Sequence, residues 1–103
     1  MQKITLYVGL NDKDSKTQKI NTLEAYKVVS NILGVDSTIT ECKGVYTHDS
    51  GDVVFETSLQ VVLLDFDGCL TAEWLKRKVE AIKQALNQEK VAVQKEQIES
   101  ELM

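Results

Sequence analysis

The sequence has no proline, a single histidine and only two cysteines in 103 residues. One histidine, His48, excludes zinc sites that take two or three histidines from one chain. Cys42 and Cys69 are too far apart for a CxxC metal or redox motif and too few for a disulfide framework, so we expect reduced thiols. The sequence therefore predicts no resident metal and no cofactor.

Membrane segments and excess positive charge are also missing. No apolar run approaches the roughly 20 residues of a membrane span, and the N-terminus lacks the charged-then-apolar layout of a signal peptide. Sixteen acidic against twelve basic residues give a net charge of −4, which disfavours binding of nucleic-acid phosphates through the overall field. We expect a cytoplasmic protein with no membrane attachment and no direct contact with nucleic acid.

The first half of the chain shows a strand, a helix and a second strand. Alternating apolar residues predict a strand over Lys3–Leu10. A capping box at Asn21 starts a helix at Thr22, and Gly34 suits its C-cap. Residues Thr38–Thr47 predict a second strand, in which Gly44 marks an expected bulge.

The second half repeats this order after a turn over residues 48–52. A strong strand begins at Val53, and Thr71 can cap a second helix whose apolar residues recur at helical spacing up to Leu86. Residues 91–93 predict a short last strand, while residues 94–103 stay open between strand, helix and an irregular tail. The order βαββαβ predicts one ferredoxin-like α+β domain over residues 1–103, an antiparallel sheet with both helices on one face.

The far end of the third strand is apolar on both faces. Val61 and Leu63 continue the core face, while Val62 and Leu64 place apolar side chains on the other. Two helices on one face cannot cover the second, so we expect a second copy of the chain to do so, in a homodimer or homotrimer.

One short motif looks like chemistry. The stretch Val61–Thr71, an apolar strand ending in DxDGxxT, resembles the first motif of haloacid-dehalogenase-type phosphatases. That resemblance implies Asp65 as nucleophile and Asp67 as acid and base beside magnesium. Such catalysis needs further ligands from later strands of a doubly wound sheet, and only 32 residues follow Thr71. We interpret the motif as a strand end, an acidic turn and a capped helix, and expect no catalytic residue.

Two broader resemblances span more of the chain. The stretches Ile4–Gly9, Gly44–Tyr46 and Val91–Glu96 are similar to PII-like proteins, which implies trimers that hold small molecules or nucleotides between subunits. The opening Ile4–Asp14 is similar to small uncharacterised proteins of phages and mobile elements of Gram-positive bacteria. That similarity implies a role against host defence.

The sequence therefore leaves three functions open. We predict a non-enzymatic, homo-oligomeric domain that binds a small molecule or nucleotide-like ligand. The alternatives are a mobile-element inhibitor that binds a host defence protein, of anti-CRISPR or anti-restriction type, and a minimal phosphatase. We place the binding surface on the first two strands, where aromatic area lies beside charged groups. Its predicted residues are Tyr7, Lys43, Tyr46 and His48.

Overall fold

The computed structural model describes residues 1–47 and 50–103. The elements follow the predicted order: β1 (Gln2–Gly9), α1 (Thr22–Leu33), β2 (Thr38–Thr47), β3 (Val53–Asp65), α2 (Ala72–Ala85) and β4 (Ala92–Gln97). The strands form one sheet in the order β2-β3-β1-β4, and every neighbouring pair is antiparallel. The ferredoxin-like α+β fold is thereby confirmed.

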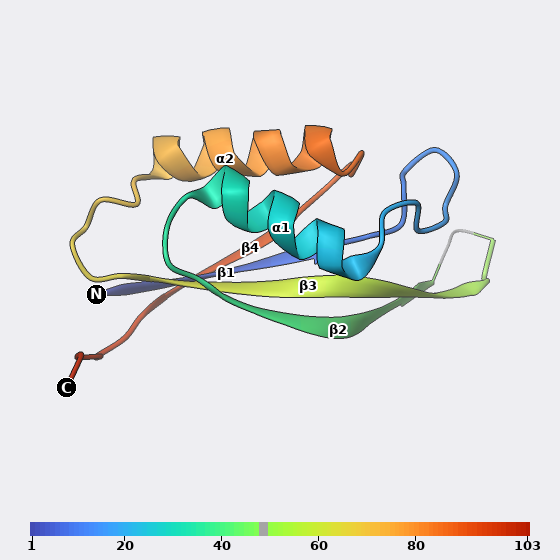
Figure 1. Cartoon of the computed structure of the whole chain (residues 1–103). Helices are drawn as coiled ribbons and strands as arrows, with labels where there is room; N and C mark the ends of the chain where they lie inside the picture. Colours follow the sequence, from blue (N-terminus) through green and yellow to red (C-terminus); the bar gives the residue numbers. More distant parts are fainter. Residues whose placement is uncertain (48–49) are drawn as a thin grey trace.

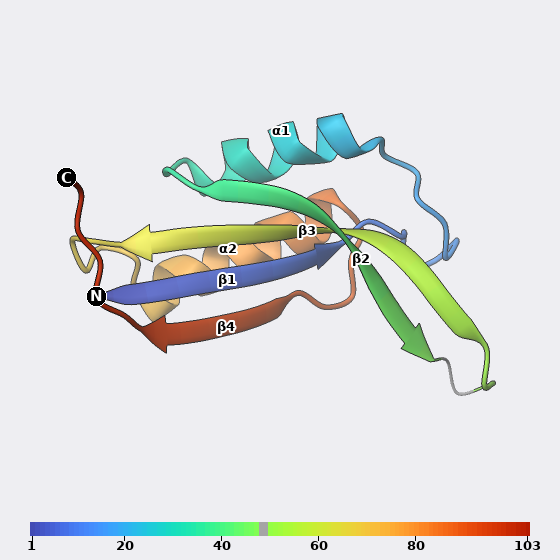
Figure 2. The same ribbon diagram turned by 90° about the horizontal axis from the view of Figure 1, so that it is seen from below.

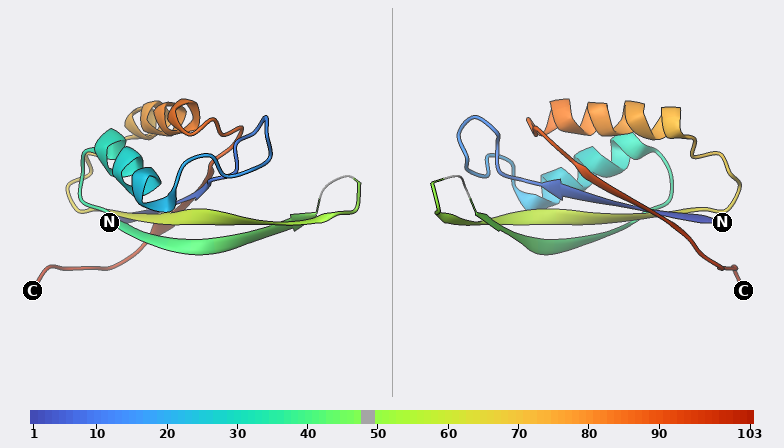
Figure 3. Two further views of the ribbon diagram at one scale, coloured as in Figure 1. Left: turned by 45° about the vertical axis from the view of Figure 1, so that its right-hand side comes forward. Right: turned by 180° about the vertical axis from the view of Figure 1, so that it is seen from behind.

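Both helices lie on one face of the sheet, and no helix or strand of the described residues lies over the opposite face (Figures 1 and 3). Alternation along β1 and β3 sends one set of side chains toward the helices, because successive strand residues point to opposite faces. These side chains pair across the two strands and pack against apolar residues of both helices. The fully buried residues of this core include Ile4, Leu6 and Val8 of β1, Leu59, Val61 and Leu63 of β3, Ala25 and Val29 of α1, and Ile82 of α2.

The helix ends use the caps that the sequence predicts. The Glu24 N–H donates to Asn21 Oδ1 at 2.8 Å, and the Trp74 N–H donates to Thr71 Oγ1 at 3.1 Å. Each such cap stabilises a helix by about 1 kcal/mol because it satisfies an otherwise unpaired backbone donor. Gly34 ends α1 with a φ of 65°, a left-handed conformation that favours glycine.

Two details of the sheet differ from the prediction. The pairing of β2 with β3 runs without interruption from Thr38 to Thr47, so the bulge expected at Gly44 is wrong. Glycine there provides room, since a Cβ would lie 3.2 Å from Ser58 Oγ. Apolar and polar residues do not alternate regularly in β2 because it is an edge strand, and its residues on the helical side still reach solvent. The last strand is also longer than predicted and continues to Gln97.

The hairpin of β2 and β3 extends beyond both helices (Figure 1). Near its end Val45 pairs with Phe55, and the exposed side chains there include Val45, Val53 and Phe55, the last 69% exposed. We call these three residues the arm patch. Among the described residues, no helix is both long and apolar enough to cross a membrane.

Candidate functional site

The open face of the sheet carries part of the surface that the sequence predicts. Tyr7 is 37% exposed, and the Gln60 Nε2 amide donates to its hydroxyl at 3.4 Å. The backbone of Tyr46 pairs with that of Val54, on the edge strand β2. The two predicted tyrosines therefore belong to strands that lie on either side of β3.

The other predicted residues do not join them. Lys43 pairs with Thr57, which lies on the helical side of the sheet, and the Lys43 ammonium donates to Thr57 Oγ1 at 2.7 Å. Lys43 and Tyr7 therefore lie on opposite faces. His48 lies outside the described residues.

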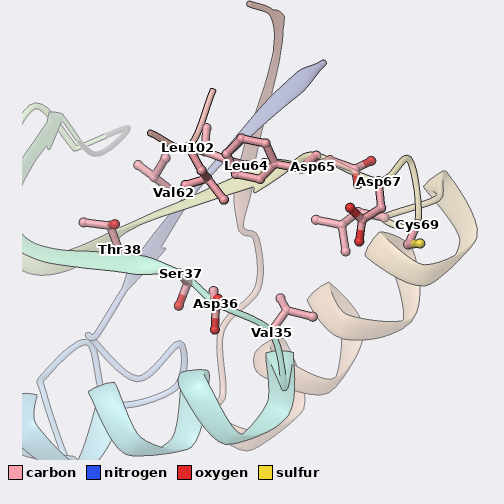
Figure 4. Close-up of a pocket in the computed structure, with 12 residues that line it drawn as sticks. Val35, Asp36, Ser37, Thr38, Val62, Leu64, Asp65, Asp67, Cys69 and Leu102 are labelled. Atoms are coloured by element: carbon pink, nitrogen blue, oxygen red, sulfur yellow. The ribbon is translucent and has the colours of Figure 1, made fainter. Parts of the chain in front are cut away.

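A cavity of about 620 Å³ lies at the other end of the sheet (Figure 4). Its origin is a difference in strand length. The first residue of β2, Thr38, pairs with Val62, whereas β3 continues to Asp65. Past Val62, within the described residues, β3 has β1 on one side and no strand on the other. The cavity occupies this gap, between the edge of β3 and the α1–β2 connection, and its volume lies within the roughly 300–1,000 Å³ of ligand pockets.

The cavity wall combines apolar and acidic side chains. Apolar residues come from the α1–β2 connection, from β3, from the turn after β3 and from the C-terminal tail. They are Val35, Val62, Leu64, Phe66, Leu70 and Leu102. Three aspartates complete the wall: Asp36, Asp65 and Asp67. The remaining lining residues are Ser37, Thr38 and Cys69.

The electrostatics of this wall favour a cation. Asp65 is only 9% exposed, and none of the three aspartates has a side-chain hydrogen bond or ion pair within the described part of the chain. No lysine, arginine or histidine belongs to the described lining. Phosphate groups need such cations or backbone donors, so a nucleotide phosphate is a poor occupant. A ligand with positive charge and an apolar body fits the wall better.

The turn after β3 explains how the acidic groups reach the cavity. Phe66 N–H donates to Leu64 O at 3.2 Å, and Gly68 has a φ of 74°, so the chain reverses sharply before the Thr71 cap. This is the stretch that resembles a phosphatase motif. The strand before it belongs to an antiparallel sheet, which does not provide the parallel strand ends that phosphatase chemistry needs. Among the described residues, no group of three or more His, Cys, Asp or Glu could hold a metal ion.

A second acidic cluster, at the opposite end of β1, is fully paired. Asn87 Nδ2 donates to Asp12 Oδ1 at 2.7 Å, and the Asp14 and Ser15 N–H groups each donate to Asp12 Oδ2 at 3.0 Å. Lys19 Nζ lies 3.9 Å from the same carboxylate. The bond from Asn87, then that from Ser15, lowers the pKa of Asp12 from 3.8 to about 2, although desolvation acts in the opposite direction. This cluster ties the loop after β1 to the turn before β4.

Sequence reasoning missed the cavity. The sequence places Asp65 in a phosphatase-like motif and predicts a subunit contact at Leu64, but neither pattern indicates a cavity. Asp36 and Leu102 carried no signal, because only the fold brings the α1–β2 connection and the tail to the end of β3.

Comparisons with known proteins point to an enzyme. No family model and no curated protein sequence matches the chain. The structure is similar to that of a phage SAM lyase in the apo state, with a TM-score of 0.66 and 29% identity over 92% of this chain and 78% of that chain. The same enzyme in complex with S-methyl-5′-thioadenosine matches with a TM-score of 0.62, at 29% identity over 92% and 79% of the two chains.

Similarity to other proteins extends to the fold alone. CutA1 from Pyrococcus horikoshii has a TM-score of 0.55 at 16% identity, over 96% of this chain and 86% of that chain. CutA1 from Oryza sativa has a TM-score of 0.51 at 20% identity, over 99% and 84%.

The expectation of a non-enzymatic domain is contradicted by the first of these similarities. A phage SAM lyase resembles this chain at 29% identity over most of both lengths. The sequence argument looked for a nucleophile, a metal or an acid–base pair in a known motif. An active site that contains none of these motifs gives no signal to such a search.

Proposed function

We propose that this chain is a lyase that cleaves S-adenosylmethionine (SAM) to S-methyl-5′-thioadenosine, with the acidic cavity as its substrate site. The similarity to phage SAM lyase carries the proposal. It also supports an origin in a phage or mobile element. The cavity supplies independent support through its charge.

SAM matches the cavity in size and charge. The substrate has an ammonium group, a carboxylate and a sulfonium, so it carries a net positive charge, and the flat face of its adenine ring can pack against apolar side chains. Six apolar side chains line the cavity together with three aspartates that form no side-chain hydrogen bond or ion pair within the described residues. The product S-methyl-5′-thioadenosine has neither sulfonium nor ammonium. An acidic site therefore attracts the substrate more strongly than the product, which favours product release.

The reaction requires one carbon–sulfur bond to break without water. The pair of electrons in the bond between sulfur and the γ-carbon passes to sulfur, which becomes a neutral thioether. The substrate's own carboxylate can attack that carbon and close a five-membered lactone, so atoms and charge balance. The protein has to hold the carboxylate against the γ-carbon, because a fixed geometry converts a rare encounter into an intramolecular step.

The two kinds of wall residue have different tasks in this step. Sulfonium and carboxylate lose their charges as the bond forms, so an apolar, water-poor wall favours the transition state. Leu64, Phe66 and Val62 form such a wall. The ammonium keeps its charge throughout, so Asp65 and Asp67 bind it equally in substrate and transition state and act on affinity.

We also propose that the chain self-associates through the arm patch. Val45, Val53 and Phe55 are each more than half exposed and lie together beyond the helices. Such an exposed apolar surface is favourably buried against another protein, and a second copy of the chain is always present to provide one. Phe55→Lys should then convert a dimer or trimer to a smaller species in native mass spectrometry, and an unchanged mass would count against this surface.

The exposed thiol of Cys69 supports a reducing compartment, and we propose that the enzyme acts in the cytoplasm.

The decisive experiment is to incubate the purified chain with SAM and follow S-methyl-5′-thioadenosine by liquid chromatography and mass spectrometry. Spontaneous SAM decay is measured without protein as the control. Lactone should form together with the thioether, and in ¹⁸O-labelled water the first-formed lactone should contain no label. Thioether release no faster than the control would overturn the proposal, and a stable complex with a host defence protein would then favour the inhibitor alternative.

A further inference from the structure

We propose that residues 98–103 form a strap that closes over the acidic cavity when the cationic substrate is bound. This inference rests on the proposed SAM lyase function. It assigns Leu102 as a substrate-contacting residue and gives the C-terminal tail a role in distinguishing substrate from product.

The strap is anchored at its start. The Ile98 N–H donates to Met1 O at 3.1 Å, one residue beyond β4, and extends the pairing of that strand with β1. From Ile98 onward the described chain forms no helix or strand, and residues 99–103 are exposed. The tail passes the start of β1 (Figure 2) and leaves the sheet on the face opposite the helices (Figure 1). One end is thus held by the sheet, whereas no hydrogen bond holds residues 99–103 within the described part of the chain.

The tip of the strap already lies at the cavity. Leu102 is a lining residue together with Leu64 and Phe66, and Figure 4 shows it beside Leu64. These three apolar side chains are 85%, 39% and 42% exposed, respectively, whereas the core residues are 6% exposed or less. Closure onto an occupant would remove apolar surface from water on both sides of the substrate, which is favourable and excludes water from the reacting atoms.

Charge couples closure to the substrate. The strap carries Glu99 and Glu101, and the cavity carries Asp36, Asp65 and Asp67. Like charges oppose closure until a cation lies between them. SAM provides that cation, and the neutral product does not. The strap should therefore close on substrate and open after the carbon–sulfur bond breaks.

Kinetics with a matched pair of variants tests the strap. Leu102→Asn replaces the apolar lining residue with an uncharged amide, and Leu23→Asn makes the same change at an exposed leucine of α1 that does not line the cavity. We expect Leu102→Asn to raise the KM for SAM about tenfold, a change equivalent to about 1.4 kcal/mol of lost binding. Leu23→Asn should change KM less than twofold. A chain that ends after Ile98 should behave like Leu102→Asn.

Hydrogen exchange provides a second readout. Sinefungin, in which a carbon bearing an amine replaces the sulfonium, is a stable cationic probe. Saturating sinefungin should slow amide exchange in the peptide 98–103, whereas S-methyl-5′-thioadenosine should not.

The outcomes separate the strap from the proposed function. A wild-type chain that releases no thioether overturns the lyase and the strap with it. Wild-type turnover with equal KM in Leu102→Asn and Leu23→Asn overturns the strap alone. Equal protection of residues 98–103 by both probes overturns the coupling to charge.

Discussion

The two ends of the central strands hold aspartates in opposite states. At one end Asp12 receives hydrogen bonds from Asn87, Asp14 and Ser15. At the other, Asp65 is equally buried and has no side-chain partner among the described residues. The Asp12 carboxylate is satisfied within the protein and is part of the architecture, whereas the Asp65 carboxylate oxygens still reach solvent and are available to a ligand.

Asp65→Asn is expected to produce the largest effect. The amide keeps the shape of the carboxylate but loses the charge-assisted contact with the substrate ammonium, worth about 1.5–3 kcal/mol, so KM for SAM should rise roughly 10- to 100-fold. Steady-state kinetics should show kcat nearly unchanged, because the ammonium keeps its charge in the transition state. Unaltered KM would remove Asp65 from the site.

Asp12→Ala should have the converse phenotype. It removes one of the two acceptors of the Asn87 amide, which also donates to Asp14 Oδ2 at 2.9 Å, and leaves two backbone N–H groups without their acceptor. Thermal unfolding should therefore shift to lower temperature by several degrees. KM for SAM should stay within twofold of wild type in assays below the melting temperature. A large rise in KM for SAM in a variant that is still fully folded would show that the two ends of the central strands are coupled.

Acid should destabilise the fold through Asp12. Its pKa is about 2 in the folded chain against an ordinary 3.8, so the unfolded state binds more protons between these values. The stability from this group is fully present above about pH 4 and is lost as pH falls toward 2. Urea unfolding across this range should be less pH-dependent in Asp12→Asn than in wild type. Identical pH profiles would mean that these hydrogen bonds do not persist in solution.

Gly9→Ala should have the smallest effect and test the structured end further. A Cβ at Gly9 would lie 2.6 Å from Glu56 Oε1, so the carboxylate would have to move away from the Asn11 N–H that it accepts at 3.1 Å. Loss of that bond costs about 1 kcal/mol, and alanine recovers part of it by restricting the unfolded chain. Calorimetry should show a net loss below about 1 kcal/mol. The Gly9→Ala change in a Glu56→Ala background, where no clash arises, should be neutral or stabilising.

The cavity and the structured loop also differ in how far they could be predicted. Turn-forming residues predicted the loop after β1, because the Asp12 carboxylate accepts hydrogen bonds from N–H groups two and three residues away. Among the described residues, the hydrogen bond that Asp12 accepts from Asn87 is the one that joins distant parts of the sequence. The predicted binding residues depended on strands meeting in the right register, and the structure divides Tyr7 from Lys43 because their pairing partners, Gln60 and Thr57, differ by an odd number of positions.

By itself the sequence determined the elements. Alternation along β1 and β3, the caps at Asn21 and Thr71, and the left-handed Gly34 act over a few residues, so neighbours along the chain suffice to specify them. The tertiary structure alone decided where the cavity lies. Its wall combines Asp36, Asp65 and Leu102, which meet because β2 begins short of the end of β3 and the tail crosses the start of β1. Strand offset and tail path follow from packing between distant segments, and no local pattern encodes them.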